Sequence, residues 1–125
     1  MRMPYQYFTL RCVPRVDREE FFNLGLVLYC QDANYLQTIW QINNAKARAL
    51  DPEIDIDAVI DTLMFMDGVC DGDEESGSVA SEPLGTRFGF LKAPRSTVVQ
   101  TGPVHGGTTE DPSAEMHRLV QLLVE

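Results

Sequence analysis

Side chains that could bind an anion or move a proton are concentrated in residues 87–105. Guanidinium groups hold carboxylates and phosphates through paired hydrogen bonds, and an imidazole beside a hydroxyl is the pair that nucleophilic catalysis needs. The stretch therefore indicates a polar site. We expect ligand contacts from Arg87, Arg95, Thr97 and Gln100, and in an enzyme we would expect His105 as the general base and Ser96 or Thr97 as the nucleophile.

Two residues nearer the N-terminus are expected to join this site. Residues 5–13 and 21–30 alternate between two sets of side chains, with Arg11 on the more polar face of the first segment and Asn23 on the corresponding face of the second. Such alternation is typical of strands, and opposite residues of neighbouring strands lie about 5 Å apart. Arg11 and Asn23 are therefore predicted to lie close together and to contribute to ligand binding.

The same side chains also have a structural interpretation. Arg95 would pair with an acidic helix, Ser96 and Thr97 would bond to turn amides, and His105 would close a loop. The sequence has no G-x-S-x-G nucleophile elbow, no pair of acids at catalytic spacing and no glycine-rich phosphate loop. We therefore predict no catalytic residue and favour a non-catalytic protein over an enzyme.

The cysteines and histidines do not form a metal-binding pattern. Cys12, Cys30 and Cys70 are an odd number without C-x-x-C spacing, which favours neither a disulfide framework nor a zinc site. His105 and His117 are too far apart to be paired by spacing alone. We expect buried, reduced thiols, no metal and no cofactor.

Negative charge is concentrated in the middle of the chain. The net charge is −9, and residues 49–86 hold 11 Asp and Glu but no Lys or Arg. This distribution repels phosphate backbones, so we expect no nucleic-acid partner. A solvated surface is the usual meaning of such a stretch, and a docking surface for a basic partner is the less common one.

Composition indicates a folded protein without a membrane span. Hydrophobic residues make up 44% of the 125 residues, enough for a core. The longest apolar run, residues 24–30, is far too short to cross a bilayer, and residues 1–6 lack the apolar region of a signal peptide. We expect a single domain over residues 1–125, located in the cytoplasm and not bound to a membrane.

Apolar periodicity predicts the elements of the first half. Alternation favours three strands joined as an antiparallel meander, over residues 5–13, 21–30 and 35–42. Good helix formers predict a short helix over residues 43–50, which Asp51 and Pro52 would close.

From Asp55 the apolar period changes to three and four residues. This spacing predicts an amphipathic helix that ends near residues 68–72, with Phe65 and its neighbouring Met residues in the core. Residues 71–85 are rich in Asp, Glu, Ser and Gly and are expected to form a mobile loop.

The last part of the chain is predicted to complete the sheet. We expect short strands over residues 88–91 and 96–101, a loop over 102–107, and a final helix that begins at Asp111 with Pro112 in its first turn. The whole pattern predicts an α+β fold: an antiparallel sheet of about five strands, with the two main helices packed on one face.

Several runs of residues are shared with a known family. The chain resembles the uncharacterised bacterial family called domain of unknown function 3037, over nearly its whole length. The resemblance implies no established activity, but it implies genomic company with HipA-like kinases and hence an accessory role. The runs that carry it are residues 7–11 with Pro14, 20–28, 50–52, 83–91, 93–100 and 103–105.

Two functions are therefore weighed. The favoured one is a non-catalytic accessory or regulatory protein that binds a protein partner, such as a HipA-like kinase, through a strand edge or the acidic surface. The alternative is an enzyme that binds a small anion or a nucleotide in an Arg/Ser/His pocket. An exposed edge strand near Pro94 would also permit a homodimer.

Overall fold

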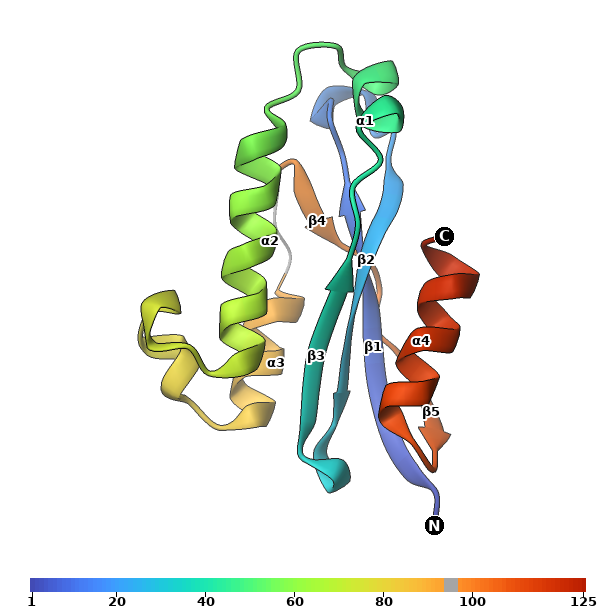
Figure 1. The fold of residues 1–125 in the computed structure, drawn as a ribbon, viewed down its shortest axis with the longest axis vertical. Coiled ribbons are helices and arrows are strands. Elements are labelled where there is room, and N and C mark those ends of the chain that lie inside the picture. Colours follow the sequence, from blue (N-terminus) through green and yellow to red (C-terminus); the bar gives the residue numbers. More distant parts are fainter. Residues whose placement is uncertain (94–96) are drawn as a thin grey trace.

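The computed structural model describes residues 1–93 and 97–125, and Figure 1 shows the arrangement of the elements. These residues form a five-stranded antiparallel sheet and four α-helices. In chain order the elements are β1 (Met3–Cys12), β2 (Phe22–Cys30), β3 (Tyr35–Trp40), α1 (Asn44–Leu50), α2 (Ile56–Asp71), α3 (Leu84–Lys92), β4 (Val99–Thr101), β5 (His105–Thr109) and α4 (Pro112–Leu123).

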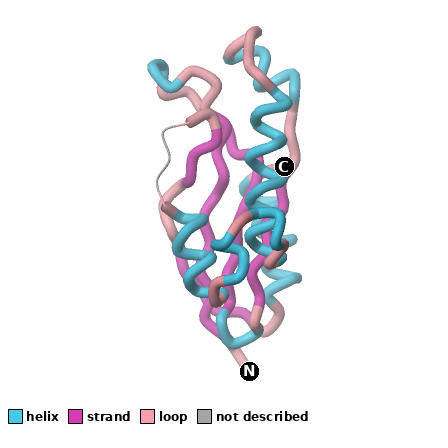
Figure 2. Tube along the Cα trace, turned by 90° about the vertical axis from the view of Figure 1, so that its left-hand side faces the viewer, coloured by secondary structure: helices cyan, strands magenta, loops and turns pink. Residues whose placement is uncertain are grey.

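Strand β1 lies in the middle of the sheet. The strand order is β3-β2-β1-β4, and β5 also pairs with β1. On the side away from β2, β1 pairs with β5 along residues 3–7 and with β4 along residues 10–12. The predicted antiparallel meander of β1, β2 and β3 is confirmed. The strands and α2 run along the long axis of the molecule (Figure 2).

Helices cover both faces of the sheet, as Figure 1 shows. Side chains of α2 and α3 join Phe8 and Leu10 in one buried cluster, on what we call the α2 face. Side chains of α4 join Tyr5 and Leu26 in a second cluster, on the α4 face. The α+β class and the five antiparallel strands are confirmed. The expectation that both main helices share one face is not met, because β1 and β2 carry apolar side chains on both faces.

A β-bulge in β2 changes which face its side chains occupy. The register with β1 shifts by one residue, which leaves Leu24 without a direct partner. As a result Leu24 packs on the α2 face and Leu26 on the α4 face, although uninterrupted alternation would place both on one face. A Cβ at Gly25 would lie 2.8 Å from both the Ile39 carbonyl oxygen and Trp40 Cβ. Glycine is therefore required where β2 and β3 approach at the bulge.

The predicted helix starts are confirmed at three positions. The side chains of Asn43, Asp55 and Asp111 each accept a hydrogen bond from the backbone N–H three residues later. Pro112 occupies the first turn of α4, where its missing N–H costs no hydrogen bond. These caps satisfy amide groups that have no partner inside the helix, so local sequence alone places the helix starts.

Helix α3 corrects the prediction of a strand over residues 88–91. Leu84, Phe88 and Leu91 are spaced four and three residues apart, which places them on one side of a helix facing the core. The Phe88 ring stacks on Tyr29 with centroids 5.0 Å apart. Residues 88–91 alone are too short to distinguish the two periods, and the packing of the longer segment decides for the helix.

Residues 71–85 also differ from the expected loop. They contain two 3₁₀ turns, Glu74–Ser76 and Ser78–Ser81, before α3 begins. A Cβ at Gly68 would overlap Ser76 Oγ, so the first turn lies directly against α2. The segment therefore packs on the end of that helix, and its mobility stays a prediction.

The final strands are shifted from their predicted positions. Strand β4 covers only the end of the expected strand over residues 96–101, and β5 begins inside the expected loop over 102–107. Gly107 in β5 lies opposite Tyr5, whose hydroxyl would be 2.6 Å from a Cβ at that position. A Gly-Gly pair carries little strand propensity by itself, and pairing with β1 beside the Tyr5 ring makes it a strand.

Within residues 1–93 and 97–125, none of the helices combines the length and the apolar character that crossing a membrane requires.

Candidate functional site

Three of the predicted site residues lie in one row across the sheet. Arg11 in β1 is opposite Asn23 in β2 and opposite Gln100 in β4. The predicted closeness of Arg11 and Asn23 is therefore confirmed. Arg11 alternates with Leu10 and Cys12, which pack on the α2 face, so its side chain is on the α4 face.

The Arg11 guanidinium is held by packing rather than by ion pairs. Its carbon Cζ lies 4.3 Å from the centroid of the Phe21 ring, which is cation–π distance. It also packs against the backbone of Gly102, where an added Cβ would be 3.4 Å from Arg11 Nε. Glycine at position 102 therefore leaves room for the guanidinium beside the sheet.

Two polar atoms in this row are buried without a hydrogen-bond partner among the described residues. They are Nε of Arg11, a donor, and Oδ1 of Asn23, an acceptor. The Asn23 amide donates from Nδ2 to the Leu123 carbonyl oxygen at 3.0 Å and so connects β2 to the end of α4. Buried polar groups without partners are uncommon and cost free energy, so their presence in one row singles out this part of the molecule.

The row opens into two separate cavities. Asn23 lines the larger, of about 470 Å³, together with residues that include Gln41, Asn44 and Lys46. Arg11 lines a smaller, open cavity of about 260 Å³. The other residues around the smaller cavity are Val13, Val16, Glu19, Phe21 and Gln100.

Arg87 has a structural position away from this row. Its Nη1 donates to the carbonyl oxygens of Val69 at 3.0 Å and Cys70 at 2.8 Å, and its Nε donates to the carbonyl of Glu82 at 3.0 Å. The last carbonyls of a helix have no partner within the helix, and a guanidinium there also interacts favourably with the helix dipole. Arg87 therefore caps α2 and does not approach Arg11.

Thr97 and Gln100 form a local turn. The Thr97 hydroxyl donates to the Val99 carbonyl at 3.0 Å, and the Gln100 amide donates to the Thr97 carbonyl at 2.9 Å. Thr97 is exposed and lines a different small cavity beside α2. Of these two residues, Gln100 alone shares a cavity with Arg11.

His105 lies at the start of β5 and outside the row. It pairs with Tyr7, and the two rings are 5.3 Å apart at their centroids. Tyr7 and Arg11 are four residues apart on β1, a separation of roughly 13 Å along a strand. Arg95 and Ser96 lie outside the described residues, so the predicted pairing of His105 with Ser96 stays a prediction.

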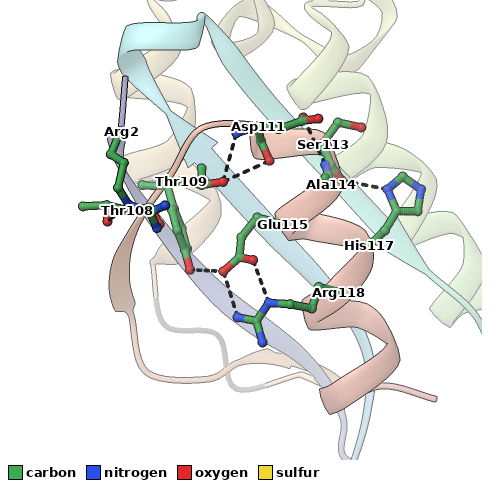
Figure 3. A network of polar contacts seen from close by, with 10 residues as sticks. Arg2, Thr108, Thr109, Asp111, Ser113, Ala114, Glu115, His117 and Arg118 are labelled. Atoms are coloured by element: carbon green, nitrogen blue, oxygen red, sulfur yellow. Dashed lines mark hydrogen bonds and ion pairs between the residues drawn. The ribbon is translucent and has the colours of Figure 1, made fainter.

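Figure 3 shows a polar network on the α4 face that the sequence did not indicate. The Tyr5 hydroxyl donates to Glu115 Oε2 at 2.5 Å, and Arg118 donates to both oxygens of Glu115 at 2.7 and 2.8 Å. The spacing of Glu115 and Arg118, three residues apart in a helix, is a signal that could have identified this pair. Their link to Tyr5 required the tertiary fold.

The network makes Glu115 a stable carboxylate rather than a general base. Hydrogen bonds from Arg118 are the main cause that lowers the pKa of Glu115 to about 2, with a further contribution from Tyr5. Burial, followed by the bond to Glu115, raises the pKa of Tyr5 to about 12. A carboxyl this acidic is a weak base at neutral pH, so the network fastens α4 to β1 and does not suit proton transfer.

An exposed aromatic pair lies on the outer side of the α2 face. The rings of Phe65 in α2 and Phe90 in α3 meet edge to face with centroids 6.1 Å apart, and each residue is 39% exposed. Met64 beside them is 60% exposed. Met66 is buried as predicted, whereas the expected core positions of Met64 and Phe65 are wrong, because both residues are exposed.

Acidic side chains border the aromatic pair. Asp57, Asp61 and Phe65 are spaced four residues apart, so they follow one side of α2. Helix α2 contains four Asp and no Lys or Arg. We call Met64, Phe65 and Phe90 with these two aspartates the α2–α3 patch.

The comparison with known proteins identifies a family. The family described as "protein of unknown function (DUF3037)" matches residues 7–124. The chain belongs to this family. No curated protein and no solved structure matches the sequence. Membership confirms the resemblance seen in the sequence and brings no activity with it.

The cysteines of this DUF3037 member are buried and free, as predicted. Burial raises the pKa of Cys12 to about 11 and that of Cys70 to about 12, so neither is a thiolate at neutral pH. In the described part of the chain, no group of three or more His, Cys, Asp or Glu side chains is placed to hold a metal ion.

Proposed function

We propose that this protein is a non-catalytic accessory protein that binds a protein partner through the α2–α3 patch. The observation that carries the proposal is the exposed Phe65–Phe90 pair beside an acidic helix. Aromatic side chains and Met are enriched at protein interfaces, where a few buried anchor residues supply most of the binding energy. An aromatic pair at the surface, in which each residue is 39% exposed, is the kind of anchor that a partner would bury.

The charges on the α2 side of the patch favour a basic partner. Asp57 and Asp61 are both exposed on the side of α2 that carries Phe65, and α2 contains no Lys or Arg. A second copy of the chain would bring a like-charged surface, at a net charge of −9 per chain, against the patch. The expected partner surface therefore combines apolar side chains with Lys or Arg.

A HipA-like kinase is the first partner to test, because family resemblance suggests its genomic company. The proposal is that the accessory protein docks on a basic, partly apolar surface of such a kinase. We also propose that this docking regulates the kinase and that the accessory protein is located in the cytoplasm.

Calorimetric titration of the purified kinase provides the experiment. Phe65→Ala should weaken binding at least tenfold, because loss of an interface anchor costs roughly 2 kcal/mol. Leu122→Ala is the matched control, since Leu122 is equally apolar, is 66% exposed and lies on α4. Equal affinity of both variants would exclude the patch, and no binding of the wild-type protein would exclude the kinase.

The alternative enzyme has less support. Nucleophilic catalysis needs a base within about 3 Å of the hydroxyl that it activates. The described contact of His105 is with Tyr7, roughly 13 Å along β1 from the level of Arg11. His105 and Arg11 therefore lie too far apart to contact the same small substrate, which disfavours the enzyme.

A further inference from the structure

Arg11 differs from most other arginines of the protein. Its guanidinium makes no ion pair or hydrogen bond with the described residues, and its Nε is buried without an acceptor. Five other guanidinium groups have polar partners: Arg2 with Thr108, Arg15 with Asp17, Arg18 with Glu20, Arg87 with backbone carbonyls, and Arg118 with Glu115.

The Arg11 side chain is held in one position before any ligand binds. The side chain is half-buried between strands, its guanidinium lies over the Phe21 ring, and the Gly102 backbone packs against it. Fixing a long side chain normally costs conformational entropy when a ligand binds. Here that entropy has already been lost on folding, so a ligand would meet a prepared cation.

A half-buried cation without a counterion is costly in a folded protein. A negatively charged ligand group would remove that cost, and a guanidinium binds a carboxylate through two parallel hydrogen bonds. The acidic residues of the loop after β1 do not supply this contact: Asp17 and Glu20 are engaged by Arg15 and Arg18, and Glu19, which lines the same cavity, makes no ion pair with Arg11.

The cavity beside Arg11 limits the kind of ligand. Its volume of about 260 Å³ suits a small molecule or the end of a chain rather than a cofactor. Val13, Val16 and Phe21 give it apolar walls, and Phe21 is 48% exposed. The walls favour a ligand with an apolar body.

Glu19 limits the negative charge that a ligand in this cavity can carry. It lines the same cavity, so its carboxylate would repel a doubly charged phosphate more than a singly charged carboxylate. The Gln100 side chain also lines the cavity and can donate or accept a hydrogen bond at the ligand head group.

We infer that Arg11 and the cavity beside it bind a small organic monocarboxylate whose apolar body lies against Phe21 and the two valines. The inference does not rest on partner binding at the α2–α3 patch, which involves other residues on the opposite face of the sheet.

The test is a titration followed by NMR, with 3-phenylpropionate as the probe. Its amide, 3-phenylpropanamide, has the same apolar body without the charge, and inorganic phosphate has the charge without the body. Each is added to the ¹⁵N-labelled full chain up to about 20 mM, above the millimolar dissociation constant expected for about ten heavy atoms. The signals followed are Arg11 Nε–H and the Gln100 side-chain amide.

Saturable shifts of both signals with the carboxylate, and at least tenfold weaker effects of the amide and of phosphate, are the expected result. Arg11→Gln should abolish carboxylate binding. Arg15→Gln should not, because Arg15 is exposed in the loop after β1 and paired with Asp17. The comparison of probes on the wild-type protein remains decisive if Arg11→Gln fails to fold.

Glu19→Gln tests the charge argument. Removing the competing carboxylate should tighten carboxylate binding by roughly two- to fivefold, the range of an exposed charge pair. Three results would overturn the inference: no shift at the highest carboxylate concentration, equal binding of the amide, or stronger binding of phosphate. Retained binding by a folded Arg11→Gln variant would overturn it as well.

Discussion

The two faces of the sheet are built from different interactions. On the α2 face, a large apolar cluster includes Phe8, Leu63 and Phe88, and the hydrogen bond from Trp40 to Asp67 is the polar side-chain contact between α2 and the sheet that the described residues show. On the α4 face, a smaller apolar cluster lies beside the network of Tyr5 and Glu115. Close packing therefore dominates one face, whereas polar contacts contribute strongly to the other.

This difference also separates the two proposed binding surfaces. The α2–α3 patch lies on the outside of a well-packed layer, so its residues are available without opening the core. Arg11 lies at the sheet itself on the other face, where α4 ends and strand β4 replaces β5. The well-packed α2 face suits docking to a partner. On the α4 face, the cavity beside the buried Nε of Arg11 leaves room for a small ligand.

The largest effect is expected from a cavity on the α2 face. Leu63 is fully buried in the main cluster, so Leu63→Ala should lower the free energy of unfolding by about 3 to 4 kcal/mol. Urea denaturation measures this loss. Leu119→Ala, in the smaller cluster of the α4 face, should cost less. An equal or larger loss for Leu119→Ala would contradict the comparison of the two faces.

Alanine substitutions at two glycines test why glycine is present at each position: to allow close packing of strands at Gly25, or without any packing need at Gly89. Gly25→Ala should cost about 2 kcal/mol, because the new Cβ meets backbone and side-chain atoms of β3 at 2.8 Å. Gly89→Ala should stabilise by roughly 0.5 to 1 kcal/mol, since Gly89 lies inside α3 with no atom within 4 Å of an added Cβ. Thermal unfolding measures both, and effects of the same sign would disprove this assignment.

The polar network predicts a pH dependence that arises on the α4 face. Glu115 has a pKa of about 2 in the fold against an ordinary value of 4.5, so its charge stabilises the protein above about pH 4.5. That contribution is lost as the pH falls towards 2. Glu115→Gln should therefore cost roughly 1 kcal/mol at neutral pH and little near pH 2.

Urea denaturation at a series of pH values measures the Glu115→Gln effect. Glu110→Gln is the control, because it removes the same charge from an exposed side chain outside the network. A difference between wild type and Glu115→Gln that is constant from pH 7 to pH 2 would contradict the network's role.

The smallest effect on stability is expected at the α2–α3 patch. Met64 is 60% exposed, so Met64→Ala should change the free energy of unfolding by less than about 0.5 kcal/mol. Partner binding should weaken in the same variant. Circular dichroism on heating measures the first quantity. A large loss of stability would show that Met64 belongs to the core of the α2 face.

Local signals made much of the fold predictable. The alternation of β1 and the capping residues Asp55 and Asp111 act over a few neighbouring positions, so they could be recognised without knowing the rest of the chain. Residues 88–91 were misassigned because four residues do not separate the helical period from the strand period. The helical spacing is visible only over the longer segment that begins at Leu84.

The site was less predictable than the fold. Register could be anticipated for Arg11 and Asn23, which lie on consecutive strands. The position of Arg87 could not be anticipated. Its partners are the carbonyls of Val69 and Cys70 at the end of α2, which folding brings next to α3. The residue type alone does not distinguish an arginine that caps a helix from one that binds a ligand.

The sequence by itself determined the family, the acidic middle of the chain, the three-stranded meander and the starts of the helices. Tertiary structure alone decided the bulge at Gly25, the division of helices between two faces and the absence of a described polar partner for Arg11. The reason is physical. Propensities and caps depend on nearby residues, whereas burial, strand register and the partner of a charge depend on segments that folding brings together.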